Sequence, residues 1–184
     1  MMWEILIPTT PDREPFMVKL RHELYRQILE CKAGKSIRLR EHDGTGTIGT
    51  KRNELLQWSS AFYISFFDSD DMPFPTYIKS NLAGIEQGVD ACSLKGIITE
   101  DGLNPKPFVH SIRYKKWEEI DGLYVRNTNH LNVLLADIAK RMRFPETNHG
   151  EDHNYSMQLL ESKLIKTEHW IEEPIYQYLH RSKK

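Results

Sequence analysis

Hydrophobic and polar positions in the first 90 residues follow two different periods. Short runs that are apolar or alternate between apolar and polar cover residues 3–7, 36–41 and 61–67, and each predicts a β-strand. The first run ends at Pro8 and is typical of a buried strand, and the third is the most apolar stretch of the chain.

Three helices are predicted between and after these strands. Thr50 can cap a helix that ends near Trp58, and Pro75 suits the first turn of another that ends near Gly88. An earlier amphipathic helix, ending near Gly34, is indicated by apolar residues at helical spacing: Phe16, Leu20, Leu24, Ile28 and Cys31. The order β-α-β-α-β-α implies a parallel sheet with right-handed crossovers, which binds ligands at the carboxyl ends of its strands.

The second half of the chain is less regular. We predict a strand over residues 91–98, a loop over 101–107 and short strands within 111–126. Apolar spacing from Leu131 to Met142 predicts a helix, followed by a loop over 144–150, a helix over 151–162 and a final strand over 164–171. No repeat or linker is visible, so the expected fold is a single α/β domain over residues 1–184 with a mostly parallel central sheet flanked by helices.

Composition narrows the class of protein. The 184 residues suffice for one domain with a substantial core, and 25 Lys and Arg against 26 Asp and Glu argue against coating nucleic acid or membranes by bulk charge. Cys31 and Cys92 suggest neither a metal site nor a disulfide framework, which favours a reducing compartment. The first residues lack the basic region of a signal peptide, and no apolar run reaches the ~20 residues that span a bilayer. We therefore expect a cytoplasmic protein, of a bacterium or of a host cell if the chain is viral.

An acidic cluster, Asp68-Ser69-Asp70-Asp71, follows the third predicted strand directly. Carboxylates this close repel one another unless a cation lies among them, and hard oxygen ligands suit Mg²⁺ or Mn²⁺. The structural alternative is that these residues cap the next helix. Three acids immediately after a buried strand favour the metal, with His180 or His169 able to complete its shell.

A glycine-rich segment, G-T-G-T-I-G at residues 44–49, matches the spacing of a dinucleotide-binding loop and has an acidic residue, Asp68, about 20 residues further on. This match keeps an NAD-dependent oxidoreductase open. The strand before the loop is charged, however, at Arg38, Arg40 and Glu41, and only 135 residues follow the motif. The loop is equally compatible with a backbone that approaches some other ligand.

Charged residues open two of the predicted helices. Lys51 and Arg52 are unfavourable at a helix N-terminus unless an anion, such as a phosphate or the acidic cluster, lies nearby. Glu151 and Asp152 are ordinary capping residues there, but either could serve as a general base.

Together these motifs resemble those of the family 2-like glycosyltransferases, which have the GT-A fold. The resemblance lies in residues 5–10, Asp43, G-T-K-R-N at 49–53, F-D-S-D-D at 67–71, F-P at 144–145 with G-E-D at 150–152, and Y-Q-Y-L-H-R-S at 176–182. These segments occur in the family's order and span nearly the whole chain. The chain departs from the family in its extra glycines at 44–49 and in its small size.

The resemblance implies a metal-dependent, inverting glycosyltransferase that moves a sugar from a nucleoside-diphosphate sugar, most simply a UDP-sugar, to an acceptor hydroxyl. Residues 1–90 would be the nucleotide-binding half and residues 91–184 the acceptor-binding half. Mn²⁺ or Mg²⁺ would be held by Asp70, Asp68 and His180. Asp152 would be the general base, and Glu151 would be less critical. The residues expected at the donor are Pro8, Thr9, Asp43, Arg52, Asn53, Asp68 and Ser69.

The acceptor and two other functions stay open. The acceptor could be a glycan, a small molecule or a modified base in viral DNA, whose phosphates would meet basic residues near the proposed base: His130, Lys140, Arg141, Arg143 and His149. A non-catalytic nucleotide-sugar binding module would bind the donor without turnover. A nucleotidyltransferase would need a glycine-rich, basic loop after the first strand, and P-T-T-P at residues 8–11 is not one.

Overall fold

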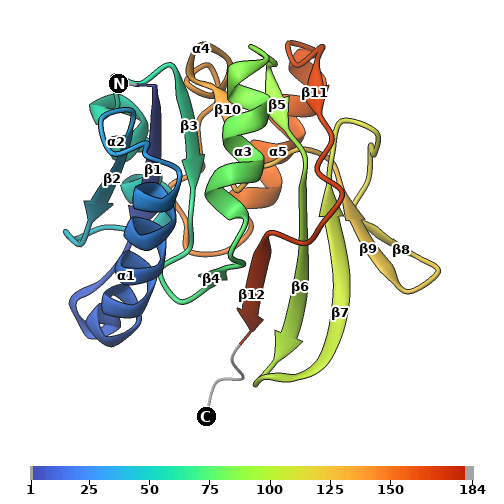
Figure 1. The fold of residues 1–184 in the computed structure, drawn as a ribbon. Helices are drawn as coiled ribbons and strands as arrows, with labels where there is room; N and C mark the ends of the chain where they lie inside the picture. The colour runs from blue at the N-terminus through green and yellow to red at the C-terminus, as the bar shows by residue number, and fades with distance from the viewer. Residues whose placement is uncertain (1, 181–184) are drawn as a thin grey trace.

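The computed structural model describes residues 2–180, which form two six-stranded sheets with helices packed around the first (Figure 1). In the first sheet, β1 (Trp3–Pro8) lies between β2 (Ile37–His42) and β3 (Tyr63–Phe66) and pairs in parallel with both. Beyond β3 lie β10 (Leu134–Leu135), β5 (Ala91–Cys92) and β11 (Glu168–His169), where β10 runs antiparallel to both neighbours. The parallel three-strand core predicted from the sequence is confirmed.

Helices cover both faces of this sheet, so the side chains of β1 are buried on either side of it. Trp3, Ile5 and Ile7 pack against α1 (Glu14–Glu30) and α3 (Tyr77–Glu86). Leu6 faces the opposite cluster, which includes side chains of α2 (Ile48–Trp58), the short α4 (Ala136–Ala139) and α5 (Glu151–Ser162). A 3-10 turn, η1 (Pro11–Arg13), leads from β1 into α1.

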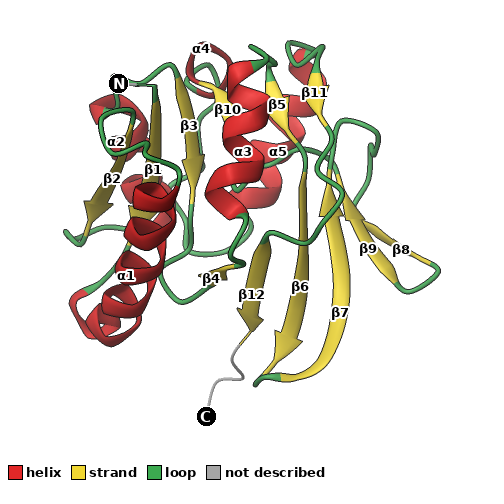
Figure 2. Cartoon of the chain, viewed as in Figure 1, coloured by secondary structure: helices red, strands yellow, loops and turns green. Residues whose placement is uncertain are grey.

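The second sheet is the part of the fold that the sequence did not predict. Its order is β4 (Met72–Pro73), β12 (Tyr176–His180), β6 (Leu94–Glu100), β7 (Leu103–His110), β9 (Leu123–Arg126) and β8 (Glu118–Ile120). The predicted strand over residues 91–98 is in fact β5 and β6, because the chain leaves the first sheet at Ser93 and enters the second. Figure 2 shows the long strands of this sheet extending away from the helices.

Two sequence predictions in the second half are wrong for local reasons. The loop predicted over residues 101–107 is mostly β7, because Asp101 and Gly102 adopt positive φ angles of 50° and 79° and turn the chain into a tight hairpin. The helix predicted from Leu131 to Met142 is reduced to α4. The side chains of Asn129 and Asn132 hydrogen-bond to nearby backbone groups and hold the chain in a turn before β10.

Smaller corrections concern element boundaries and faces. Thr47, rather than Thr50, caps α2, and its Oγ1 accepts the Thr50 N–H at 3.1 Å. In the first turn of α1, Met17 is buried rather than the predicted Phe16, which is 37% exposed. The predicted final strand shrinks to β11, and the true last strand is β12. Arg181 and Ser182, which contribute to the sequence resemblance, lie outside the described residues.

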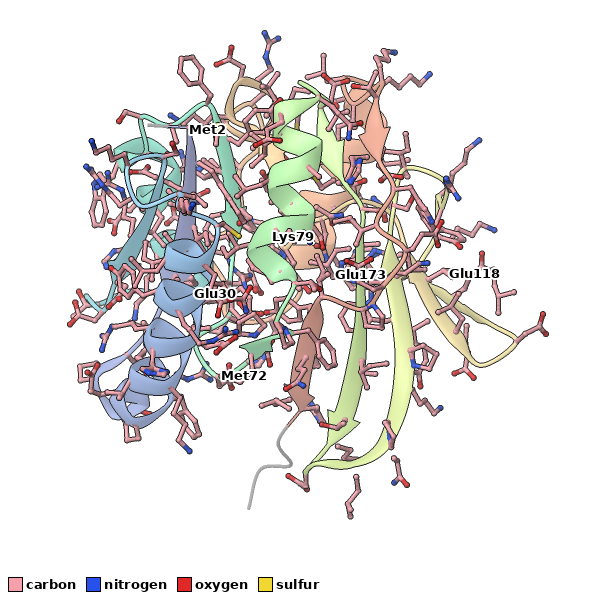
Figure 3. The ribbon with its side chains drawn as sticks, in the orientation of Figure 1. Met2, Glu30, Met72, Lys79, Glu118 and Glu173 are labelled. Atoms are coloured by element: carbon pink, nitrogen blue, oxygen red, sulfur yellow. The ribbon has the colours of Figure 1, made fainter. Side chains whose placement is uncertain are left out.

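The acidic cluster connects the two sheets. Asp71 is buried and accepts hydrogen bonds from the Tyr176 hydroxyl at 2.8 Å and from the Leu179 N–H at 2.7 Å, both on β12. The Phe67 and Tyr176 rings lie 4.5 Å apart between their centroids. Met72, labelled in Figure 3, follows Asp71 and begins the short strand that pairs with β12. The position of the acidic cluster is therefore fixed from both sides.

Gly49 allows an unusually close approach between α2 and the loop that precedes α5. A Cβ atom at this position would lie 1.8 Å from the Pro145 carbonyl oxygen. This explains the third glycine of the G-x-G-x-x-G segment by packing within the protein, without a dinucleotide.

We expect Gly49→Ala to lower the free energy of unfolding by about 3 kcal/mol, the upper end of the usual cost of overpacking, because the clash is with backbone. Urea denaturation of the variant measures this loss. Gly34→Ala is the matched control, since no atom lies within 4 Å of its added Cβ, and it should change stability by less than about 1 kcal/mol. Equal stability of the two variants would contradict the close approach.

Candidate active site

A cleft of about 590 Å³ opens at the carboxyl ends of β1 and β3. This is the edge where a parallel sheet of this kind binds its ligands. The wall is built from the segment after β1, the start of α2, the acidic cluster, the loop before α5, and β12. The lining residues are Pro8, Thr9, Thr10, Asp12, Arg13, Gly46, Ile48, Lys51, Arg52, Asp68, Asp70, Asn148, Glu151 and Tyr178.

Arg52 joins the acidic cluster to the start of α5. Its side chain is 4% exposed and donates to Asp68 Oδ1 at 2.8 Å and to Glu151 Oε1 at 2.6 Å. Its guanidinium also lies 5.5 Å from the centroid of the Phe144 ring. Burial alone would raise the pKa of Asp68, but the charge of Arg52 and its hydrogen bond outweigh burial and hold that pKa well below its usual range. The anion expected near the basic start of α2 is therefore the protein's own carboxylates.

Two further cations reach the cleft. Arg13, from η1, donates to Asp70 Oδ1 at 2.8 Å and to Ser69 Oγ at 3.1 Å. Lys51 donates to the Thr9 carbonyl oxygen at 2.7 Å. Arg13 could not be selected from the sequence, because its role depends on the turn of η1, which directs the side chain to the acidic cluster.

The predicted donor residues do not all line the cleft. Pro8, Thr9, Arg52 and Asp68 do. Asp43 is exposed and lies outside the lining. Ser69 is buried and contributes through its contact with Arg13. The structure gives Asn53 a structural task instead, because its amide donates to the Phe144 carbonyl oxygen at 2.8 Å and accepts the Phe144 N–H at 2.9 Å.

The predicted metal ligands are only partly brought together. Asp68 and Asp70 both line the cleft, and their carboxylates are the hard donors that Mg²⁺ or Mn²⁺ prefers. Within residues 2–180, no three His, Cys, Asp or Glu residues converge closely enough to hold an ion. His180 ends β12, exposed, two residues after Tyr178. His169 lies on β11 and contacts Gln87. An ion held by these two carboxylates would need its remaining ligands from a substrate or water.

A smaller pocket of about 200 Å³ adjoins the cleft and shares part of its wall, including Arg52, Asp68 and Glu151. Asp152 lines only this second pocket, with its Oδ1 accepting the His153 N–H at 2.8 Å. Asn129 and His130 line it as well, and both are buried. Sequence reasoning missed Asn129 entirely and selected His130 only as a phosphate contact for DNA, for which 3% exposure leaves no room.

The other basic residues proposed for DNA are partly engaged within the protein. Lys140 donates to the Ser59 carbonyl oxygen, Arg141 to that of Asp137, and Arg143 pairs with Glu146. Only His149 joins His130 in lining the second pocket. No helix among the described residues is long and apolar enough to cross a membrane.

Comparison with solved structures identifies the fold. The crystal structure of S. aureus TarS, residues 1–349, matches with a TM-score of 0.68 at 18% identity over 97% of this chain. The same fragment in complex with UDP-GlcNAc matches with a TM-score of 0.67 at 16% identity over 100% of this chain. The complex of that fragment with UDP matches with a TM-score of 0.67 at 16% identity over 97% of this chain. This chain covers 60% of the length of each.

The fold is therefore a GT-A-like glycosyltransferase fold, as the sequence resemblance predicted. No protein-family model matches the sequence, and a search of the curated proteins finds no match. Membership of family 2 stays a prediction.

Replacing Arg52 should be costly because it would leave Asp68 and Glu151 without their shared counter-charge. We expect Arg52→Met to lose about 3–5 kcal/mol of unfolding free energy in urea denaturation. Arg21→Met is the matched control. Arg21 also bridges two carboxylates, Glu14 and Glu41, but is 29% exposed, and its loss should cost about 1 kcal/mol or less. Similar losses in both variants would refute the buried bridge.

Proposed function

We propose that this chain is a glycosyltransferase domain that transfers a sugar from a nucleoside-diphosphate sugar, most simply a UDP-sugar, to an acceptor hydroxyl. One observation carries the proposal. Three cations and four carboxylates meet in one cleft at the carboxyl ends of parallel strands, and that cleft adjoins a second pocket containing Asp152. The GT-A-like fold supports this reading, as does the capture of S. aureus TarS in complexes with UDP-GlcNAc and with UDP.

The donor would lie in the larger cleft. Pro8 and Thr9 would face its nucleoside, with Asp43 as the predicted contact to the base. A diphosphate is anionic, and Arg13 and Lys51 line the cleft on the side of η1 and α2. Arg52 is engaged by two carboxylates, so its role is to position Asp68 and Glu151 around the donor rather than to bind the nucleoside directly.

Asp70 and Asp68 would hold Mn²⁺ or Mg²⁺, with phosphate oxygens completing the shell and His180 as the predicted further ligand. When bound, such an ion would neutralise charge on the departing diphosphate. Arg13 already engages Asp70, so this side chain would share or release the carboxylate when an ion binds.

Asp152 is the proposed general base. It would remove the proton of the acceptor hydroxyl as that oxygen attacks the anomeric carbon, and a base opposite the leaving group gives inversion. Glu151 is bound to Arg52 and holds the start of α5 in place. A glycan, a small molecule and a modified base in DNA remain candidate acceptors. A cytoplasmic setting remains part of the proposal.

Calorimetric titration of UDP, ADP, GDP and NAD, each with and without Mn²⁺, tests the donor site. We expect metal-dependent binding of a nucleoside diphosphate that weakens at least ~10-fold in Asp70→Ala. Asp137→Ala, which removes an exposed carboxylate on α4, should leave binding unchanged. Binding of NAD that is indifferent to metal and to Asp70 would instead favour an oxidoreductase that uses residues 44–49.

Asp152→Asn tests the base. We expect turnover, measured as UDP release from UDP-sugars with candidate acceptors, to fall by about 10²–10⁴-fold while UDP affinity is unchanged. Glu161→Gln, an exposed change on the same helix, is the control. A parallel fall in donor affinity would show that Asp152 binds the donor. Donor binding without any turnover in the unmodified protein would identify a binding module.

A further inference from the structure

The segment between β9 and β10, residues 127–132, is polar and yet almost completely buried. Its sequence is N-T-N-H-L-N, and each of its residues is at most 3% exposed. Most of its polar groups are used within the protein. Asn127 donates to the Ser156 carbonyl oxygen at 2.8 Å, and Asn132 donates to that of Cys92 at 2.8 Å.

Three side chains of this segment keep polar atoms without such partners. One of them, Thr128, lines a different pocket, and the other two are Asn129 and His130. Neither ring nitrogen of His130 has a hydrogen-bond partner among residues 2–180, and the Asn129 Nδ2 group has none in the same range. The nearest carboxylate oxygen to His130 is Asp68 Oδ2, 4.0 Å from Nε2 and beyond hydrogen-bonding distance. Asn129 and His130 both line the pocket of about 200 Å³ that also contains Asp152.

Packing does not explain a histidine at position 130. Its ring lies between the aromatic rings of Phe66 and Phe144, at centroid distances of 5.9 Å and 6.1 Å. A phenylalanine would make the same contacts without polar atoms, and a buried polar group left unpaired destabilises the folded protein. The unpaired nitrogen atoms border a pocket, so they are available to form hydrogen bonds with a ligand that enters it.

The chemistry of the pocket wall defines the ligand. A neutral imidazole offers one donor and one acceptor, and the Asn129 amide offers two donors. Carboxylates of Asp68, Glu151 and Asp152 alternate with Arg52 and Arg126, so neither sign of charge dominates. Such a wall suits a neutral ligand whose groups both donate and accept, which is the property of vicinal hydroxyl groups.

We propose that Asn129 and His130 bind the hydroxyl groups of a sugar ring held between Asp68 and Asp152, and so select the sugar that this site accepts. This inference rests on the proposed function, because it assigns the pocket to the sugar side of the transfer. The ring could belong to the donor, whose diphosphate would lie in the adjoining cleft, or to an acceptor sugar approaching Asp152. The hydroxyl chemistry is shared, and the experiment separates the two sources.

The central variant is His130→Phe, which keeps the aromatic packing and removes both nitrogens. We expect its melting temperature to equal or exceed that of the unmodified protein. Three probes are titrated: UDP, a panel of UDP-sugars (UDP-GlcNAc, UDP-glucose and UDP-galactose), and free GlcNAc or glucose observed by saturation-transfer NMR. If the ring is the donor's, affinity for the bound UDP-sugar falls at least tenfold and UDP affinity is unchanged. If it is the acceptor's, UDP and UDP-sugar affinities are both unchanged and the free-sugar signal is lost.

Thr128→Val is the matched control. Thr128 lies in the same segment, is also buried and has an unpartnered Oγ1 among the described residues, but it lines a different pocket. The control should keep all sugar binding. Asn129→Asp is a second variant. It preserves the oxygen that accepts the Leu131 N–H at 2.9 Å and converts the unpartnered donor into an acceptor, so the same selective loss is expected.

Failure of the sugar site and failure of the proposed function give different results. Unchanged binding of UDP-sugars and free sugars in both His130→Phe and Asn129→Asp, with a folded protein, would overturn the sugar site even if UDP binding confirms the proposed function. Failure of the unmodified protein to bind UDP or any other nucleoside diphosphate would count against the proposed function. In that case, the free-sugar measurement still decides whether Asn129 and His130 bind hydroxyl groups.

Discussion

The buried guanidinium of Arg52 is the interaction on which the geometry of the site depends. It joins α2 to Asp68, 16 positions further along the chain, and to Glu151, 99 positions further along. A charge this buried is stable only if its partners reach it, so the end of β3 and the start of α5 must both meet the first turns of α2. The neighbours of Arg52 act in the same way. Lys51 binds the end of β1 through Thr9, and Asn53 binds the backbone of Phe144. Three consecutive buried polar residues thus hold three parts of the cleft wall to α2: the end of β1, the acidic cluster, and the loop that leads into α5.

The acidic cluster is divided among different partners, which explains how three carboxylates can lie so close together. Asp68 pairs with Arg52, Asp70 with Arg13, and Asp71 receives hydrogen bonds from β12. Burial and the charge of Asp68 raise the pKa of Asp71, while the Leu179 N–H and the Tyr176 hydroxyl oppose that rise. Asp71 therefore belongs to the junction between the sheets. Asp68 and Asp70 are left facing the cleft. They are therefore the members of the cluster available to the metal ion proposed for this site.

The first half of the fold could be predicted from the sequence, because hydrophobic period and β-α alternation determine a parallel sheet locally. The second sheet could not. β6 and β7 form a hairpin, but β12 joins this hairpin and β4 through pairings between segments far apart in the chain. The same division holds for the site. Asp68, Asp70, Arg52 and Glu151 stand in recognisable motifs, whereas Arg13 enters through the turn of η1, and Asn129 and His130 enter through a buried segment with no pattern. Their positions depend on tertiary packing, which no local pattern records.

The two adjacent acids at the start of α5 have different roles. Glu151 holds the helix to Arg52, and Asp152 is the proposed base. Successive residues of a helix point about 100° apart, so Glu151 can face inward to Arg52 while Asp152 faces the smaller pocket. This division requires the helix to begin at one particular residue. Gly150 provides that start, with a left-handed φ of 76° that other residues rarely adopt. The loop before it is held by Asn53 at Phe144 and by the contact between Gly49 and Pro145. A shift of one residue in this loop would place Asp152 against Arg52 and His153 in the pocket, or, in the other direction, Glu151 in the pocket and no acid against Arg52. The close packing of α2 against the loop is therefore a condition for the chemistry proposed at Asp152, although Gly49, Asn53 and Pro145 do not themselves line the smaller pocket.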